Sequence, residues 1–396
     1  MGDILTYAQT YQEQSFKEQP FNIVDSLILC QLAYYKYEGS SFEKIFFDKK
    51  LCDFYRNNTP DRIILKGMLT REGDEKMIPL LSTGGRHGDV RACRYVEKLS
   101  VEEEIQFAAI TFEISKGEYF IAIRGTDASV VGWKEDFALS FQTEIPAQKA
   151  AFEYVYETML ALPGKFYIGG HSKGGNLAVY AAMNLPENVQ KRVKAVYSFD
   201  GPGFLKEVYE QANYRTIHHA VHKIIPRSSV VGMILEEWAE HKVVQSCREL
   251  YMQHNPYTWQ VEGTDFLYME GEDAFSKMVK RTFDGWLEEL DWNERSKIIG
   301  TVFRVIEETG ITSFYELTEQ KVDKIKRLLD GAAQIEPEER KRIHLAVKRL
   351  LTIAKEELKF VARTERMIQI EKGVVQLEKY TAKIEKLIQS IPRVDK

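Results

Sequence analysis

Hydrophobic and polar residues alternate with two different periods along this chain. Residues 22–36 place apolar side chains at helical spacing, which predicts an amphipathic helix with Asn22 at its N-cap. The glycine-rich stretch 82–89 is typical of a loop. Residues 106–114 and 118–126 are β-patterned on either side of a Lys-Gly turn, so we expect a β-hairpin there.

Downstream of the hairpin, short apolar runs alternate with helical segments. The predicted strands are 165–170, 193–200 and 214–225. The predicted helices are 152–163 and 174–186. Strands that alternate with helices pack as a parallel sheet with helices on both faces. We therefore expect an α/β fold.

Beyond residue 272 the β pattern disappears. Helical periodicity runs through 275–290, 294–308, 313–330 and 337–390. Thr312 or Ser313 is expected to cap the third of these helices, with Glu316 placed for a capping box. The chain is thus predicted to hold an α/β domain at 1–272 and a helical C-terminal domain at 273–396.

Composition narrows the class of protein. The 396 residues are 44% hydrophobic and 29% charged, with a net charge of −5, an ordinary globular mix that does not favour a nucleic-acid partner. The four cysteines form no C-x-x-C pair and are interpreted as reduced thiols of a cytoplasmic protein. Neither a signal peptide nor an apolar run long enough to span a membrane is evident.

The C-terminal helices differ in charge from the rest of the chain. Residues 337–396 contain 15 Lys and Arg against 9 Asp and Glu, a net charge of +6, which leaves −11 for the remainder. The favoured interpretation is helix–helix packing within the molecule. The alternatives are a coiled coil that forms a homodimer, and a basic face that binds an anionic partner.

Candidate chemistry begins at residues 170–174, Gly-His-Ser-Lys-Gly, which fit the G-x-S-x-G pattern. A predicted strand precedes this pattern and a predicted helix follows it, which is the context of a nucleophile elbow. Glycines are needed there because the turn packs tightly against neighbouring backbone. Ser172 is therefore the predicted nucleophile, and the backbone N–H of Lys173 is a predicted oxyanion donor. The alternative is a glycine-rich turn with an incidental serine.

A family resemblance follows from these motifs taken together. RGT followed by Trp and Asp within residues 121–141, then GHSKGG, resembles the class 3 lipases, which are α/β-hydrolases. Closer still is an uncharacterised bacterial branch of that superfamily, which shares VDSL, QLAYY, GWKEDF, FDGPGF, SSVVGM and QHNPYTWQV. The resemblance covers roughly residues 22–265 and implies an α/β-hydrolase fold with no established substrate.

The resemblance also implies a second oxyanion donor. In class 3 lipases the hydroxy residue after Arg-Gly supplies it, and here that residue is Thr126. Its position just past a strand end suits a binding loop, and its N–H or hydroxyl can face an oxyanion. Trp133 and Asp136 are expected to brace the loop. The alternative is an ordinary turn threonine.

The general base must come from a downstream histidine, because hydrolases of this fold order their triad as serine, acid and histidine. The candidates are His218, His219, His222, His241 and His254. We select His254, which lies in a loop after the last strand-like run, and the resemblance supports it. The alternative for His254 is a structural histidine.

The acid is harder to assign. Class 3 lipases place an aspartate three residues before a proline, and in this chain Lys223 stands at that place. Asp200, at the end of a predicted strand, is the best substitute, although it also suits a turn residue that satisfies local N–H groups. His218 and His222 would form a metal pair only on a helix, so no metal is expected.

These residues predict a serine-dependent acyl hydrolase of the lipase or esterase kind. Its substrate would be a small acyl ester or a lipid, and no cofactor is required. The alternative is a non-catalytic binding or scaffold protein that uses the helical region for interaction, which Lys223 favours.

Overall fold

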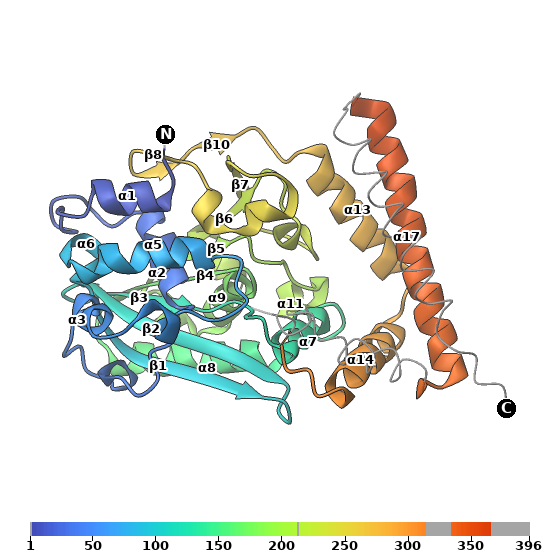
Figure 1. The fold of residues 1–396 in the computed structure, drawn as a ribbon, viewed down its shortest axis with the longest axis horizontal. Helices are drawn as coiled ribbons and strands as arrows, with labels where there is room; N and C mark the ends of the chain where they lie inside the picture. The colour runs from blue at the N-terminus through green and yellow to red at the C-terminus, as the bar shows by residue number, and fades with distance from the viewer. Residues whose placement is uncertain (1, 212–213, 314–333, 366–396) are drawn as a thin grey trace. The chain divides into compact units, whose positions relative to one another are not determined.

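The computed structural model describes residues 2–211, 214–313 and 334–365 (Figure 1). The chain divides into two compact units, Met1–Glu272 and Asp273–Lys396. All strands of the described residues lie in the first unit, which also contains the candidate site.

Among the described residues of the first unit, eight strands form one sheet. In spatial order they are β1 (Arg91–Ser100), β2 (Ile105–Ser115), β3 (Glu118–Ile123), β4 (Lys165–His171), β5 (Val193–Phe199), β6 (Val221–Pro226), β7 (His241–Val244) and β10 (Tyr268–Met269). The strands from β3 to β7 are parallel, whereas β1, β2 and β3 pair antiparallel and β10 is antiparallel to β7. A separate short ribbon pairs β8 (Val261–Glu262) with β9 (Asp265–Phe266).

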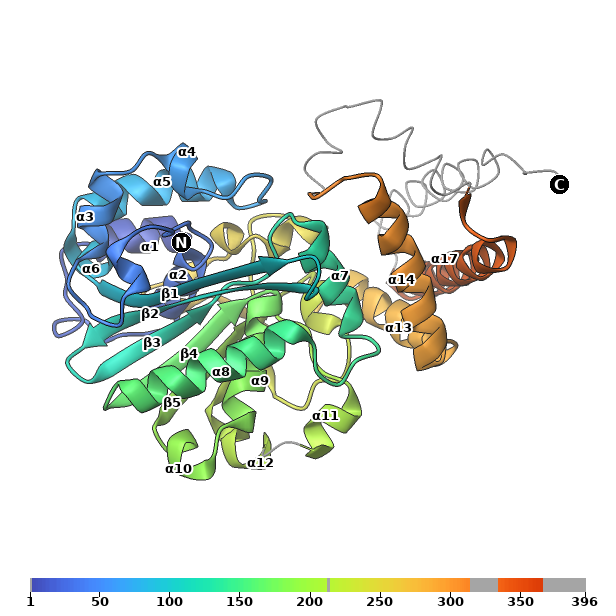
Figure 2. The same cartoon turned by 90° about the horizontal axis from the view of Figure 1, so that it is seen from below.

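Helices cover both faces of the sheet (Figure 2). The helices α8 (Pro146–Ala161) and α9 (Lys173–Asn184) pack on one face, and α2 (Ile23–Leu32) packs on the other with α1 (Ile4–Thr10) and α5 (Arg71–Ser82) beside it. A mostly parallel sheet between two helical layers confirms the α/β-hydrolase fold that the sequence predicts.

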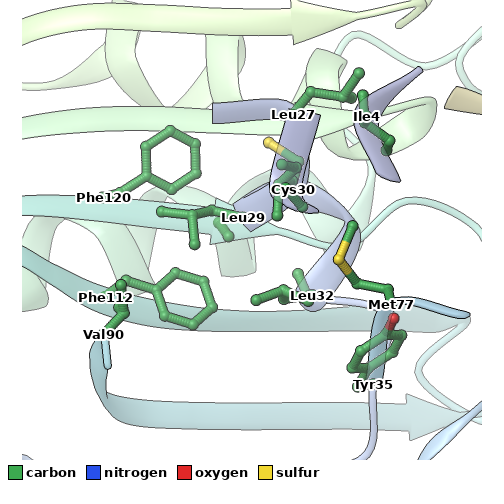
Figure 3. Close-up of a cluster of buried hydrophobic side chains, with 14 of the residues drawn as sticks. Ile4, Leu27, Leu29, Cys30, Leu32, Tyr35, Met77, Val90, Phe112 and Phe120 are labelled. Atoms are coloured by element: carbon green, nitrogen blue, oxygen red, sulfur yellow. The ribbon is translucent and has the colours of Figure 1, made fainter. Parts of the chain in front are cut away.

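The helix α2 forms the centre of the core. Asn22 caps it, and Asp25 completes a capping box by accepting a hydrogen bond from the Asn22 N–H at 3.0 Å. Figure 3 shows side chains of α2 such as Leu29 packed against Phe112 and Phe120 of the sheet, and Ile4 from α1 on the other side. All residues from Val24 to Leu32 are buried, so α2 is a buried helix and not the amphipathic one expected.

Shorter helices connect these elements. They are α3 (Leu51–Arg56), α4 (Pro60–Ile63), α6 (Gly85–Gly88), α7 (Val130–Ala138), α10 (Glu187–Gln190), α11 (Lys206–Gln211) and α12 (Tyr214–Ile217). The 3₁₀ turns are η1 (Ser41–Glu43), η2 (His218–Ala220), η3 (Val231–Met233), η4 (Leu250–His254) and η5 (Pro256–Thr258).

The second unit is helical where it is described, with α13 (Ala274–Glu288), α14 (Trp292–Glu308) and α17 (Pro337–Glu365). The indole N–H of Trp286 on α13 donates to the backbone oxygen of Ala346 on α17 at 3.0 Å. The predicted helix at 313–330, its Glu316 capping box and the end of the predicted helix 337–390 lie outside the described residues.

Three further local predictions are wrong. Residues 214–220 form α12 and η2, so the strand expected at 214–225 begins only at Val221. Within the expected loop at 82–89, residues Gly85–Gly88 form a helical turn, where Arg86 is buried against Asp25 at 2.6 Å. The hairpin's second strand ends at Ile123, which leaves the Arg-Gly-Thr segment as a loop above the sheet.

Candidate active site

Ser172 occupies a sharp turn between β4 and α9, and it is the residue that caps α9. Its backbone has φ 58° and ψ −135°, a conformation that L-residues rarely adopt. The turn closes tightly, because a Cβ built on Gly170 would lie 2.2 Å from the backbone of Gly174. The backbone N–H of Ser172 donates to the oxygen of Phe199 at 2.9 Å, so β5 holds the bend in place.

The Arg-Gly-Thr loop lies directly against this turn. A Cβ built on Gly125 would fall 3.1 Å from the Cβ of Ser172 and 2.4 Å from the backbone oxygen of His171. Thr126 follows at once, and its hydroxyl lies 2.7 Å and 2.6 Å from the two carboxyl oxygens of Asp136 on α7. Because that hydroxyl is held by Asp136, the backbone N–H of Thr126 is the group left to face an oxyanion.

Asp136 braces the loop, and its carboxyl group is partly buried. Burial raises the pKa of Asp136 to about 6, against the opposing effects of the Lys173 charge and the hydrogen bond from Thr126. Trp133, the other expected brace, lies on the same helix and is 44% exposed.

Lys173 contributes to the site in two ways. It is the first residue of α9, where a backbone N–H has no partner within the helix. Its side chain is buried, and the ammonium group lies 2.7 Å from Glu135 of α7 and 2.8 Å from the side-chain oxygen of Gln106 on β2. The Gln106 amide donates to the backbone oxygen of Gly125 at 3.3 Å, so this buried network supports the Arg-Gly-Thr loop from below.

Asp200 lies directly after β5 and is fully buried. One of its carboxyl oxygens accepts hydrogen bonds from the Ser229 hydroxyl at 2.5 Å and from the Gly232 N–H at 3.1 Å. Burial alone would raise the pKa of Asp200, but the hydrogen bonds from His254 and Ser229 hold it below its ordinary value. The carboxylate is therefore ionised at neutral pH, in a position where it can orient a base.

His254 is the partner of Asp200. Its Nδ1 lies 2.6 Å from the second carboxyl oxygen of Asp200, and its side chain is 24% exposed, which leaves the ring accessible. The buried Trp259 fixes the loop, since its indole N–H donates to the backbone oxygen of Gln253 at 2.7 Å. The sequence had offered Asp200 and His254 as separate candidates, and the structure places them in one hydrogen bond.

His171, the residue before Ser172, connects the nucleophile turn to the loop of His254. The rings of His171 and His254 have centroids 4.6 Å apart, and His171 Nε2 lies 2.8 Å from the backbone oxygen of His254. Among the described residues, no direct hydrogen bond joins the Ser172 hydroxyl to His254. Catalytic hydrogen bonds are often long without substrate and shorten when substrate binds.

Known proteins resemble this chain in sequence and in fold. The profile of the Mbeg1-like family matches residues 81–304, more than half of the chain and all of the elements from β1 to β10. The chain belongs to the Mbeg1-like family. Among solved structures, this Mbeg1-like chain is similar to the crystal structure of M37 lipase, with 16% identity and a TM-score of 0.34 over 52% of this chain and 68% of that one. No curated protein matches it significantly.

Lys223, where class 3 lipases place their acid, has another role in this Mbeg1-like protein. It lies on β6 with a buried side chain that forms an ion pair with Glu237. The departure from the lipase pattern therefore does not leave His254 without a carboxylate, because Asp200 provides one from β5.

Two residues at the site of this Mbeg1-like chain lie in motifs quoted above, QLAYY and SSVVGM, but the sequence did not indicate their roles. Tyr34 follows α2, and its hydroxyl lies 3.2 Å from the backbone oxygen of His171. Ser229, which donates to Asp200, belongs to the SSVVGM motif, so the motif pointed to it without giving its role.

The described residues show neither a metal-binding cluster nor a membrane-spanning helix. Within the described ranges, no three His, Cys, Asp or Glu side chains come together in a way that could hold a metal ion. His218 lies on η2 and His222 on β6, so the pair does not share a helix face. None of the helices in the described part of this Mbeg1-like chain combines the length and apolar character needed to cross a membrane.

Proposed function

We propose that this protein is a serine-dependent acyl hydrolase that cleaves a carboxylic ester through an acyl-enzyme. The observation that carries the proposal is the 2.6 Å hydrogen bond between Asp200 and His254. The ring of His254 lies 4.6 Å, centroid to centroid, from that of His171, the residue before a serine held at φ 58°. A nucleophile, a base and a group that orients the base are the three parts that this chemistry requires.

The proposed reaction begins with a proton transfer. The Nδ1 of His254 donates to the ionised Asp200, which leaves Nε2 to accept the proton of the Ser172 hydroxyl. The Ser172 oxygen attacks the acyl carbonyl, and the imidazolium then gives its proton to the leaving alcohol. Water attacks the acyl-enzyme by the same route in reverse, which releases the acid and restores Ser172.

Two backbone N–H groups are proposed to stabilise the tetrahedral intermediate. Lys173 supplies one from the N-terminus of α9, whose positive end also favours a negative charge. Thr126 supplies the other from the loop that lies against Ser172. Removing a single donor of this kind reduces turnover by about 10²–10³-fold.

The scaffold alternative rested on Lys223 in place of the usual acid. The hydrogen bond between Asp200 and His254 favours the hydrolase, because a scaffold has no need of a buried ionised carboxylate aimed at a partly exposed imidazole.

A fluorophosphonate probe tests the proposal, because it reacts covalently with activated serines. We expect the wild type to be labelled, Ser172→Ala not to be labelled, and His254→Ala to react at least about 10³-fold more slowly. Ser100→Ala, at the end of β1, is the matched control and should label as the wild type does. A panel of p-nitrophenyl esters then gives the preferred acyl length. Correctly folded wild type that resists the probe, or Ser172→Ala that reacts with it, would contradict the proposal.

A further inference from the structure

A hydrogen-bonded pair, Tyr34 and His171, lies beneath the proposed base. His171 is 4% exposed, and its Nε2 lies 2.8 Å from the backbone oxygen of His254. Its Nδ1 lies 3.3 Å from the hydroxyl of Tyr34, which is also buried. The proposed mechanism uses neither side chain.

The contacts fix the protonation state of His171. A carbonyl oxygen can only accept a hydrogen bond, so Nε2 of His171 must carry the proton that it donates to His254. Nδ1 is then an acceptor, and the single proton of the Tyr34 hydroxyl is shared between Nδ1 at 3.3 Å and the backbone oxygen of His171 at 3.2 Å. Burial, and next the neighbouring His254, lower the pKa of His171 to about 3, so the ring is neutral wherever His254 can act as a base.

Tyr34 extends the contact to the oxyanion loop. A Cβ built on Gly125 would lie 2.3 Å from the Tyr34 hydroxyl, so the phenol lies directly against the Arg-Gly-Thr loop. The same hydroxyl lies 3.2 Å from the backbone oxygen of His171, next to Ser172. One phenol and one imidazole therefore contact the oxyanion loop, the nucleophile turn and the base loop.

We propose that His171 and Tyr34 are positioning residues, which set the distance between the Ser172 turn and the His254 loop through the hydrogen bond from His171 Nε2 to the His254 backbone. This inference rests on the proposed function of Ser172 and His254. The N–H of His171 holds the main chain of His254, while Asp200 orients the ring. A misplacement of about 1 Å between reacting groups can reduce a rate by about 100-fold.

Replacing His171 by amide residues of two different lengths distinguishes a positioning role from a simple packing role. The amide nitrogen of glutamine is as many bonds from Cβ as His171 Nε2, whereas that of asparagine reaches only as far as Nδ1. We expect His171→Gln to retain most of the fluorophosphonate labelling rate and His171→Asn to lose about 100-fold. Tyr34→Phe should lower the rate less than His171→Asn. His222→Asn, a histidine of β6 outside the site, is the matched control and should label as the wild type does.

A measurement that needs no activity accompanies the labelling. The Nδ1 proton of His254, held by Asp200 at 2.6 Å, should give a low-field proton NMR signal. We expect that signal in the wild type and in His171→Gln, and its loss in His171→Asn. If the probe does not label the wild type, the proposed function fails, and the NMR signal alone still decides the positioning role. If His171→Asn keeps both the labelling rate and the signal of His171→Gln, the positioning role is refuted.

Discussion

At the scale of single residues, Ser172 combines a chemical role with an unfavourable backbone. Its φ of 58° is accessible to glycine and disfavoured for residues with a Cβ. Such conformations cost about 1–3 kcal/mol and persist only where the surroundings impose them. Here the N–H of Ser172 bound to Phe199 and the close contact of Gly170 with Gly174 impose it.

The strain at Ser172 predicts that a glycine variant is more stable than an alanine variant, the reverse of the usual order. Ser172→Gly should be more stable than Ser172→Ala by about 1 kcal/mol, because relief of strain exceeds the entropy that glycine adds to the unfolded chain. Urea denaturation of both variants measures the difference in free energy of unfolding. At Glu153, exposed within α8, the order should be the ordinary one, with alanine more stable by about 1 kcal/mol. Equal stabilities at position 172 would show that the turn is not strained.

The role of a single residue could be predicted from the sequence only where the evidence for it lies in the neighbouring residues. Ser172 could be predicted because its neighbouring glycines are part of one short motif. Asp200 could not be separated from a turn residue, since its pairing with His254 spans 54 positions and exists only in the folded chain. The structure shows His171 buried, and its contact with His254 spans 83 positions, so no local pattern could predict it.

At the scale of elements, periodicity predicted the central β3–α8–β4–α9–β5 succession, because buried parallel strands and their crossover helices have distinct hydrophobic patterns. The strand β1 escaped prediction because it is an edge strand with four exposed positions among its ten residues. The helix α7 escaped too, although it carries Asp136 and Glu135. The strand expected at 214–225 was too long because α12 and η2 share its apolar pattern.

The helices α7 and α9 meet through a buried ion pair, whose disruption should be costly. Lys173→Met leaves Glu135 buried and unpaired, so it should destabilise the protein by about 3–5 kcal/mol, and Glu135→Gln should do so similarly. The double variant should lose less free energy of unfolding than the two single variants added together, since neither charge then remains buried. Thermal and urea unfolding of the three variants measure this coupling. Single variants that unfold like the wild type would show that the pair does not hold α7 against α9.

At the scale of the whole molecule, a buried carboxylate joins the beginning of the first unit to its end. Asp74 of α5 accepts hydrogen bonds from Gln31 at 3.0 Å, from Tyr35 at 3.1 Å and from Tyr257 at 2.8 Å. Tyr257 is three residues beyond His254, so helices from the first quarter of the chain hold the loop of the proposed base. No local pattern could predict this contact, because its partners are up to 183 positions apart.

Asp74 should make stability depend on pH in a defined direction. Burial raises the pKa of Asp74 from its ordinary value of 3.8 to about 6, although four side-chain hydrogen bonds oppose this rise. Between these values the folded protein binds a proton that the unfolded chain has released. The stabilisation from this group is therefore complete below pH 3.8 and is lost as the pH rises through about 6.

Replacement of Asp74 by asparagine removes that titration and isolates its effect. We expect the free energy of unfolding of the wild type, relative to Asp74→Asn, to fall by up to about 3 kcal/mol between pH 4 and pH 7. Urea denaturation at several pH values measures the difference, and Asp48→Asn at an exposed position should follow the wild type in parallel. Other carboxylates, including Asp136 and Asp200, titrate in both proteins, so only the difference reports on Asp74. A difference that stays constant with pH would mean that Asp74 titrates alike in the folded and unfolded chains, and the junction between α2, α5 and the His254 loop would then not depend on its charge.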